Sequence, residues 1–331
     1  MSDLRVGIIG LGMMGRHHAR VVREISGVEL VAVADPFGDV HGVAGSLTAL
    51  ESVDQLIATG IDMAVCAVPT AQHEDVGLAL AEAGVHTLIE KPIAHSVEAG
   101  ERLVEAFTSR GLIGAVGHVE RYNPALQSLR ARMANGDLGE IYQIATRRQG
   151  PFPARIADVG VVKDLATHDI DLTAWLAQSH YVGISAQTTT RSGREHEDMI
   201  AVTGRLADGT ITNHLVNWLS PMKERVTVVT GEKGAFVADT LTADLTFHGN
   251  GVIDTEWASV ANFRGVSEGD VIRFAIPKPE PLRTEHECFR DAVLGVADRT
   301  VDLAQGLETL RTAEWALAAA QESGRQSLVT R

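Results

Sequence analysis

The sequence predicts an α/β protein in which a doubly wound parallel sheet is followed by a domain with an open, mainly antiparallel sheet. Over the first 117 residues, short apolar runs alternate with helical patterns, which is the order of a parallel sheet with crossover helices. From about residue 182 to 247 the pattern changes to hairpins. The length of 331 residues also favours two domains. We therefore predict a boundary near residue 118, giving domains 1–118 and 119–331.

Five apolar runs in the first domain predict strands buried on both faces, because hardly any polar residue interrupts them. These runs are residues 5–9, 30–34, 63–68, 86–89 and 112–116. Helical patterns between them predict helices at residues 14–25, 74–83 and 97–109. Ser96 stands at the N-cap position of the third helix, and Gly84 and Gly111 follow two helices where a left-handed residue is common.

The second domain has a different order of elements. Helices are predicted at residues 123–134, 161–177, 284–294 and 302–322, and a strand at residues 141–148. Asp208-Gly209 separates two apolar runs, residues 199–206 and 210–218, and is a strong hairpin turn. A second hairpin joins residues 226–230 to 235–238. Such a pattern predicts an antiparallel sheet with helices on one side.

The composition argues against several classes of protein. With 43 acidic and 29 basic residues and a formal net charge of −14, the chain lacks the basic surface that nucleic-acid binding requires. Two cysteines, Cys66 and Cys288, do not form a disulfide framework and fit a reducing compartment. No apolar run approaches the about 18 residues of a membrane span, and the start of the chain does not resemble a signal peptide. We therefore expect a cytoplasmic protein that binds neither membranes nor nucleic acid.

A glycine turn lies between the first predicted strand and the first helix. Gly10, Gly12 and Gly15 form a G-x-G-x-x-G pattern, in which the glycines allow a tight turn, a close phosphate and close helix packing. The helix N-terminus supplies N–H groups to the phosphates. The alternative is a glycine-rich turn of another α/β fold. The position of the pattern favours a Rossmann domain whose turn, with Met13 and Met14, binds a dinucleotide.

Asp35 ends the second predicted strand, 20 residues after Gly15. An acid at this place accepts hydrogen bonds from the ribose hydroxyls and repels a 2′-phosphate, so the sequence favours NAD as cofactor, although it does not exclude NADP. The alternative is a surface acid in a turn. His17 and His18 are expected on the first helix, near the phosphates or at the surface, and not as metal ligands, because adjacent helical residues do not share a face.

The ends of the predicted strands 63–68 and 86–89 carry further candidate residues. Ligands of doubly wound sheets gather at the carboxyl ends of the strands. There Lys91 could bond a substrate hydroxyl and stabilise an alkoxide-like transition state, while a surface ion pair is the alternative. The residues expected near the cofactor at these ends are Pro69, Thr70, His73, Glu90 and Lys91.

The second cluster of candidates lies on the predicted helix 161–177. Asp164 and His168 are four residues apart and share a face, and Asp171 continues it. A histidine beside a carboxylate is a good general base for oxidising a secondary alcohol. One alternative is an ordinary first helical turn with a packed histidine. Another is a metal site, but further nitrogen or sulfur ligands at typical spacing are not evident, and we predict no metal.

Together, the glycine turn, Glu90-Lys91-Pro92 and the Asp164–His168 pair resemble the Gfo/Idh/MocA oxidoreductases. The resemblance covers nearly the whole chain. It implies a Rossmann domain that binds NAD, a substrate-binding and oligomerisation domain, and a homodimer or homotetramer. It also implies that Lys91, Asp164 and His168 are the catalytic set, with His168 as acid and base and the lysine and imidazole on the same side of the nicotinamide.

Two further segments, residues 117–124 and 147–153, resemble a subgroup described as UDP-N-acetylglucosamine 3-dehydrogenase-like. The resemblance implies oxidation of the sugar C3 hydroxyl. It places four residues on the floor of the substrate cleft: Glu120, Arg121, Tyr122 and Asn123. Three arginines could bind a diphosphate, although an ordinary polar loop is an equal alternative for each: Arg147, Arg148 and Arg155.

Two alternative functions remain open. One is an inositol or free-sugar dehydrogenase that uses the same residues without a nucleotide on the substrate. The other is a nucleotide-bound sensor without turnover, which would not require an acid and base pair. Residues 250–275 match no pattern that predicts a role.

Overall fold

The computed structural model describes residues 3–153, 159–251 and 267–329 of the 331. The chain forms two compact units. The first contains Met1–Val119 together with Pro279–Arg311, and the second contains Glu120–Lys278 together with Thr312–Arg331. The first unit therefore includes Pro279–Arg311 from late in the chain, because this segment packs on its sheet. The division into residues 1–118 and 119–331 stays a prediction about function.

The first unit is built on a six-stranded sheet in the order β3-β2-β1-β4-β5-β6, with all strands parallel. The sequence pattern predicted five of these strands, but not β3, whose two residues are too few to show a periodicity. The strands are β1 Leu4–Ile9, β2 Val28–Ala34, β3 Ala49–Leu50, β4 Met63–Cys66, β5 His86–Glu90 and β6 Gly114–Gly117.

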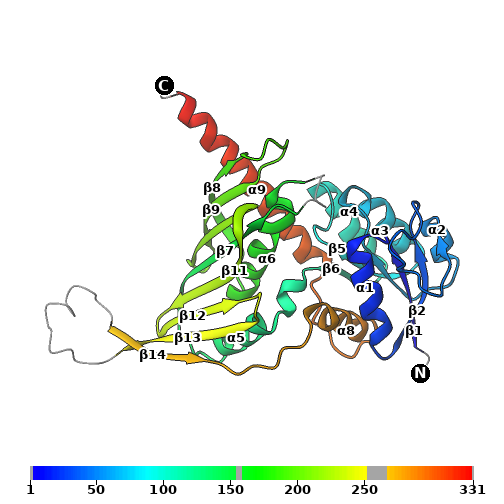
Figure 1. The fold of residues 1–331 in the computed structure, drawn as a ribbon, viewed down its shortest axis with the longest axis horizontal. Coiled ribbons are helices and arrows are strands. Elements are labelled where there is room, and N and C mark those ends of the chain that lie inside the picture. The colour runs from blue at the N-terminus through cyan, green and yellow to red at the C-terminus, as the bar shows by residue number, and fades with distance from the viewer. Residues whose placement is uncertain (1–2, 154–158, 252–266, 330–331) are drawn as a thin grey trace. The chain divides into compact units, whose positions relative to one another are not determined.

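Helices cover both faces of this sheet (Figure 1). The predicted ends are confirmed at three places: the Ser96 hydroxyl accepts a 3.3 Å hydrogen bond from the amide of Ala99, and Gly84 and Gly111 have φ of 75° and 64°. The pattern missed the short α2. The helices of this unit are α1 Met13–Glu24, α2 Val53–Ile57, η1 Thr70–Gln72, α3 His73–Glu82, α4 Val97–Thr108, α8 Pro281–Val293 and the first part of α9 Leu303–Val329.

Two hydrophobic cores lie on the two faces of the sheet. Ile9 belongs to the core that contains α2, α3, α4 and the start of α9, while its neighbour Ile8 belongs to the core that contains α1 and α8. Successive strand residues point to opposite faces, so this alternation places α8 beside α1. Burial of both faces explains why the strands are almost continuously apolar.

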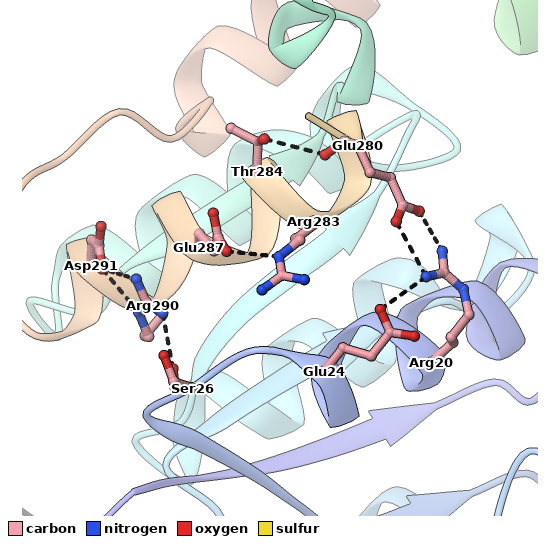
Figure 2. A network of polar contacts seen from close by, with 9 residues as sticks. All are labelled: Arg20, Glu24, Ser26, Glu280, Arg283, Thr284, Glu287, Arg290 and Asp291. Carbon is pink, nitrogen blue, oxygen red and sulfur yellow. Dashed lines mark hydrogen bonds and ion pairs between the residues drawn. The ribbon is translucent and has the colours of Figure 1, made fainter. Parts of the chain in front are cut away.

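Polar contacts at the surface tie α8 to α1 and its following turn (Figure 2). Arg20 on α1 forms an ion pair with Glu280, and Arg290 donates a 2.9 Å hydrogen bond to the carbonyl of Ser26. Exposed ion pairs of this kind contribute little stability. Their position nevertheless shows that the two helices, which are more than 250 residues apart in the sequence, pack directly on each other.

The second unit is built on an eight-stranded sheet in the order β14-β13-β12-β11-β7-β10-β9-β8. Among the described strands of this second sheet, only β7 and β10 pair in parallel. The other pairs of this sheet are antiparallel. Gly209, with φ of 93°, turns the chain between β9 and β10 as predicted. The strands are β7 Ile141–Pro151, β8 Tyr181–Thr189, β9 Met199–Leu206, β10 Ile211–Asn217, β11 Leu219–Gly231, β12 Gly234–Asp239, β13 Asp244–Gly251 and β14 Ser267–Arg273.

The helices of the second unit pack on one face of this sheet (Figure 1). One prediction needs correction: residues 161–177 do not form a single α-helix, because the segment begins as a π-helix and continues as α6. The wider π turn changes which side chains share a face, and such turns are frequent at functional sites. The helices are η2 Val119–Tyr122, α5 Pro124–Ala134, η3 Val162–Ala166, α6 Thr167–Ala177 and the remainder of α9. In the part of the chain that the structure describes, no helix is long and apolar enough to cross a membrane.

Candidate functional site

The glycine turn at the end of β1 has one open side. A Cβ on Gly10, whose φ is 89°, would lie 2.5 Å from the carbonyl oxygen of Ala67, and one on Gly15 would lie 1.9 Å from that of Gly10. A Cβ on Gly12 would meet no other heavy atom of the described residues within 4 Å. Two of the glycines are therefore required by the fold itself, while the third leaves a surface that a phosphate can approach.

The residues around this turn fit a dinucleotide. Helix α1 begins at Met13, and no described side chain caps its first N–H groups, which remain directed toward the open side of the turn. The Asp35 carboxylate accepts hydrogen bonds from the amides of Leu11 and Phe37 at 2.8 and 2.9 Å. A carboxylate has about four acceptor positions, so Asp35 can still accept ribose hydroxyls while these bonds fix its orientation.

The segments after β4 and β5 lie next to each other in the first unit. Pro69 is exposed and Thr70 is half-buried, whereas His73 is buried. The ring of His73 bridges the two segments, with Nδ1 2.9 Å from the carbonyl of Pro92 and Nε2 3.0 Å from that of Val68. Burial lowers the pKa of His73. The histidine therefore holds the two segments together, and its expected contact with a cofactor stays a prediction.

Glu90 ends β5 and is buried, and Lys91 beside it is half-buried. One carboxylate oxygen of Glu90 accepts the backbone amide of Lys91 at 3.0 Å, and the other lies 2.9 Å from Nε2 of His18. Of the two expected places for His18, the surface is wrong, because its side chain is 0% exposed; its nearness to the phosphates stays a prediction. Its spacing from Gly15, Ala19 and Val22 places it on the buried stripe of α1, and this periodicity could have predicted its burial.

In the second unit, the candidates on η3 and α6 differ in exposure. Asp164 is buried within the π-helix, and His168 is half-buried in the first turn of α6. Because the Asp164 carboxylate is buried, a role in orienting a neighbouring hydrogen-bond donor is favoured. Asp171 on α6 forms an ion pair with Arg121, whose guanidinium donates hydrogen bonds to the two carboxylate oxygens at 2.8 and 2.6 Å. Arg121 is therefore held as one half of a bidentate ion pair.

The arginines of β7 lie on opposite faces of the strand. Arg148 is buried and donates to Asp169 at 2.9 Å and to Glu120 at 2.8 Å. Burial alone would lower the pKa of Arg148, but the two carboxylates raise it above its ordinary value. Arg147 is exposed and pairs with Glu224 at 2.6 Å. Arg155 lies outside the described residues.

Two further residues of the predicted substrate floor are part of the local fold. Asn123 is the N-cap of α5: its side-chain oxygen accepts the amide of Ala125 at 3.0 Å, and its amide donates to the carbonyl of Thr240 at 3.0 Å. Tyr122 beside it is buried. Both residues shape the backbone at the start of α5. Among the described residues, no group of three or more His, Cys, Asp or Glu is arranged to hold a metal ion.

Comparison with protein families agrees with this arrangement. Residues 4–118 match the family described as "Oxidoreductase family, NAD-binding Rossmann fold", and residues 126–237 match the "GFO/IDH/MocA C-terminal domain". The chain belongs to the Gfo/Idh/MocA oxidoreductase family. The predicted family and fold class are confirmed. The matched ranges fall on the parallel sheet of the first unit and on α5 and much of the sheet of the second.

Individual relatives of the chain are sugar and inositol dehydrogenases. It is 34% identical over 216 residues to UDP-N-acetylglucosamine 3-dehydrogenase of Acidithiobacillus ferrooxidans, covering 64% of this chain and 66% of that protein. It is 31% identical over 193 residues to inositol 2-dehydrogenase 4 of Saccharopolyspora erythraea, covering 56% of this chain and 57% of that protein. Each alignment thus spans less than two thirds of the relative.

A solved structure extends the similarity to the whole chain. The structure of UDP-N-acetylglucosamine 3-dehydrogenase GnnA from Acidithiobacillus ferrooxidans matches with a TM-score of 0.84 and 27% identity, covering 97% of this chain and 99% of that one. The relationship therefore includes the second unit as well as the Rossmann unit.

Proposed function

We propose that this protein is an NAD-dependent dehydrogenase that oxidises a secondary hydroxyl of a sugar or nucleotide sugar. The observation that carries the proposal is in the first unit. There the open glycine turn follows β1 and Lys91 follows β5, two parallel strands that are separated by β4 and end at the same edge of one sheet, and a hydrogen bond between His18 and Glu90 connects them. This edge is where doubly wound sheets bind their ligands.

The proposed chemistry assigns one role to each of three residues. His168 takes the proton of the substrate hydroxyl, and the buried carboxylate of Asp164 orients the imidazole and stabilises its protonated form. Lys91 donates to the same oxygen and stabilises the negative charge that develops on it. The reaction requires Lys91 and His168 to reach the same carbinol. The NAD, when bound, supplies the hydride acceptor.

The cofactor is proposed to be NAD and not NADP. Gly12 and the N–H groups at the start of α1 would hold its pyrophosphate, and Asp35 would accept the ribose hydroxyls. A carboxylate at this place repels a 2′-phosphate. The other residues proposed to lie along the cofactor are Gly10, Met13, Met14, Gly15, Pro69, Thr70, His73, Glu90 and Lys91.

For the substrate, we propose UDP-N-acetylglucosamine oxidised at C3. The support is the 34% identity to an enzyme of that name, combined with the similarity of the complete fold. Arg148 already has two carboxylate partners, so we propose that it supports the floor of the site and does not bind a diphosphate. The residues proposed to contact the substrate are Lys91, Glu120, Arg121, Tyr122, Asn123, Asp164 and His168, with Arg148 behind them as their support.

A second candidate is oxidation of inositol. The 31% identity to inositol 2-dehydrogenases favours it, and the same three catalytic residues would serve. A panel of nucleotide sugars, free sugars and inositols, with NADH formation as the readout, separates the two candidates. Turnover of inositol alone would replace the nucleotide-sugar assignment.

The test of the catalytic set uses Lys91→Ala and His168→Ala. General acid–base groups contribute about 10²–10⁴-fold, so we expect kcat to fall by at least about 100-fold in each variant. His248→Ala, which removes an exposed histidine of β13, is the matched control and should keep the wild-type rate. Wild-type turnover in both catalytic variants would overturn the assignment. Tightly bound NAD without redox change on any polyol would instead support a sensor.

The oligomeric state is also a proposal. Helices pack on one face of the second sheet, and the other face includes the exposed side chains of Arg147 on β7 and Thr203 on β9. We propose that this face pairs with a second copy in a homodimer or homotetramer. Light scattering of the purified protein measures the mass directly, and a monomer at all concentrations would contradict it.

A further inference from the structure

A row of buried polar side chains leads from Lys91 into the first unit. Glu90 at the end of β5 lies 2.9 Å from Nε2 of His18 on α1. Nδ1 of His18 lies 2.8 Å from Nε2 of His286 on α8. The two histidines are 0% and 2% exposed. Three elements that are distant in sequence therefore each contribute one member to a continuous hydrogen-bonded row.

The position of α8 brings His286 into this row. The helix packs on α1, and the exposed contacts of Arg20 with Glu280 and of Arg290 with Ser26 hold the outer side of the pair (Figure 2). On the inner side the two imidazole rings meet edge to face, with centroids 5.0 Å apart. The same helix pair thus has an exposed ionic side and a buried histidine side.

The hydrogen bonds limit the charge that this row can carry. Since one of the two facing nitrogens of His18 and His286 must lack a proton, the two rings hold at most one positive charge. Burial, followed by the charge of His18, lowers the pKa of His286 well below its usual range. Burial, the largest single contribution, would raise the pKa of Glu90, but the hydrogen bond and charge of His18, together with the charge and backbone amide of Lys91, more than offset it and the pKa is lowered.

The pKa shifts of the other titratable groups around Glu90 are consistent with Glu90 being the ionised carboxylate of this cluster. Glu285 on α8 is buried, and its two oxygens have no hydrogen-bond partner among the described residues. Burial and the charge of Glu90 raise the pKa of Glu285 well above its usual range, so it is a neutral acid. Cys66 on β4 and His73 on α3 also face Glu90, and burial keeps both uncharged. Among the described residues, the Glu90 carboxylate then faces His18 and Lys91 as cationic partners.

We propose that His18 and His286 are positioning residues for Lys91. They keep Glu90 ionised and turned toward the backbone amide of Lys91, and this carboxylate holds the backbone from which the lysine side chain extends and places a negative charge near that side chain. A residue on α8 that touches neither cofactor nor substrate thereby sets the state of a catalytic group. The inference rests on the proposed function only in giving Lys91 a role in turnover.

The variants that test the inference are matched in size. His286→Leu removes the contact to His18, whereas His286→Gln places an amide donor near the former Nε2. Glu90→Gln removes the charge at the other end of the row and keeps the shape. Glu280→Gln weakens the exposed side of the same helix pair and leaves the row intact, so it is the control.

The first measurement does not need turnover. Trace acetylation by acetic anhydride, read by peptide mass spectrometry, reports how readily the Lys91 amine loses its proton. Loss of a facing negative charge should raise the Lys91 rate about fivefold or more in Glu90→Gln and His286→Leu, with His286→Gln and Glu280→Gln unchanged. Wild-type rates in both test variants would overturn the proposal. If His286→Leu does not fold, Glu90→Gln alone decides.

The second measurement uses the pH dependence of kcat. His286→Leu should lower kcat by about ten- to a hundredfold with little change in KM for NAD, and His286→Gln should restore it. The acid limb should move to higher pH, because Glu90 binds a proton more readily when His286 no longer holds His18 in place. A wild-type profile in His286→Leu would overturn the inference. If no sugar or polyol is turned over by the wild-type protein, the proposed function fails and the acetylation rates alone decide the inference.

Discussion

Nε2 of His18 lies 2.9 Å from the carboxylate of Glu90, although 72 residues separate them in the chain. His18 belongs to α1, which begins at the glycine turn, and Glu90 carries Lys91 as its neighbour. The helix that would hold the cofactor phosphates and the strand that positions the lysine are therefore joined by a buried hydrogen bond. A displacement of one is transmitted to the other through a short, charge-assisted contact.

Gly12→Ala and Gly15→Ala should separate binding from folding. The added methyl group at position 12 meets open space, so the melting temperature should stay within about 2 °C while NADH affinity falls by at least about tenfold. At position 15 the methyl group would lie 1.9 Å from the carbonyl of Gly10, so stability should fall as well. Thermal unfolding and NADH fluorescence titration measure the two effects. Equal affinity in Gly12→Ala and wild type would contradict the proposed phosphate site.

Asp35→Asn should relax the discrimination against NADP. The amide oxygen can still accept the Leu11 amide, but the charge that repels a 2′-phosphate is gone. We expect the ratio of kcat/KM for NAD over NADP to fall by about tenfold or more. Steady-state rates with both cofactors measure the ratio, and Asp39→Asn, which alters an acid of the following loop, is the control. An unchanged ratio would show that Asp35 does not face the ribose.

Arg148→Leu should destabilise the protein far more than Arg147→Leu. Removing Arg148 leaves the buried Asp169 without its partner, and breaking such a pair costs about 3–5 kcal/mol. The pair of Arg147 with Glu224 is exposed and is worth at most about 1 kcal/mol. Urea unfolding of the two variants gives the comparison. Similar stabilities would mean that Arg148 is not a structural residue and would return it to the list of diphosphate ligands.

His214 should make the second unit sensitive to acid. It is buried between the Thr146 and Tyr181 hydroxyls, each 2.8 Å away, and burial lowers its pKa to about 4. The unfolded chain binds this proton near pH 6.5, so the stabilising contribution is complete above that pH and is lost as the pH falls toward 4. The loss amounts to about 3 kcal/mol. Urea unfolding at pH 7 and pH 5 should show a smaller difference for His214→Gln than for wild type, and equal differences would contradict a neutral His214.

Local patterns in the sequence were enough to predict the parts of the fold that depend on local backbone geometry. The glycine turn, Asp35 and the cap at Ser96 each follow from requirements within a few residues, and the structure has them where expected. The Asp208-Gly209 hairpin is of the same kind. The π-helix was not predictable, because Val162–Ala166 has the same apolar spacing as an ordinary helical turn.

Contacts between distant segments were beyond such patterns. The partner of His18 is on α8, and those of Arg148 are on η2 and α6, so these pairings could not be derived from neighbouring residues. Arg148, like Arg147, was expected at the substrate because residues 147–153 resemble a nucleotide-sugar dehydrogenase subgroup and guanidinium groups bind phosphate well. The strand pleat decides between the two arginines, since it buries one and exposes the other.

Helix α9 has a consequence for the order in which the chain can fold during synthesis. Leu307 on this helix packs over Gly100, while Ala313, less than two turns further, lies in the core of the second unit. The ribosome must therefore complete Glu120–Lys278 before the last pieces of the first unit emerge, a delay on the order of ten seconds. During that interval the parts of the two apolar cores that α8 and α9 later cover stay exposed, and a chaperone that shields them would act on the nascent first unit.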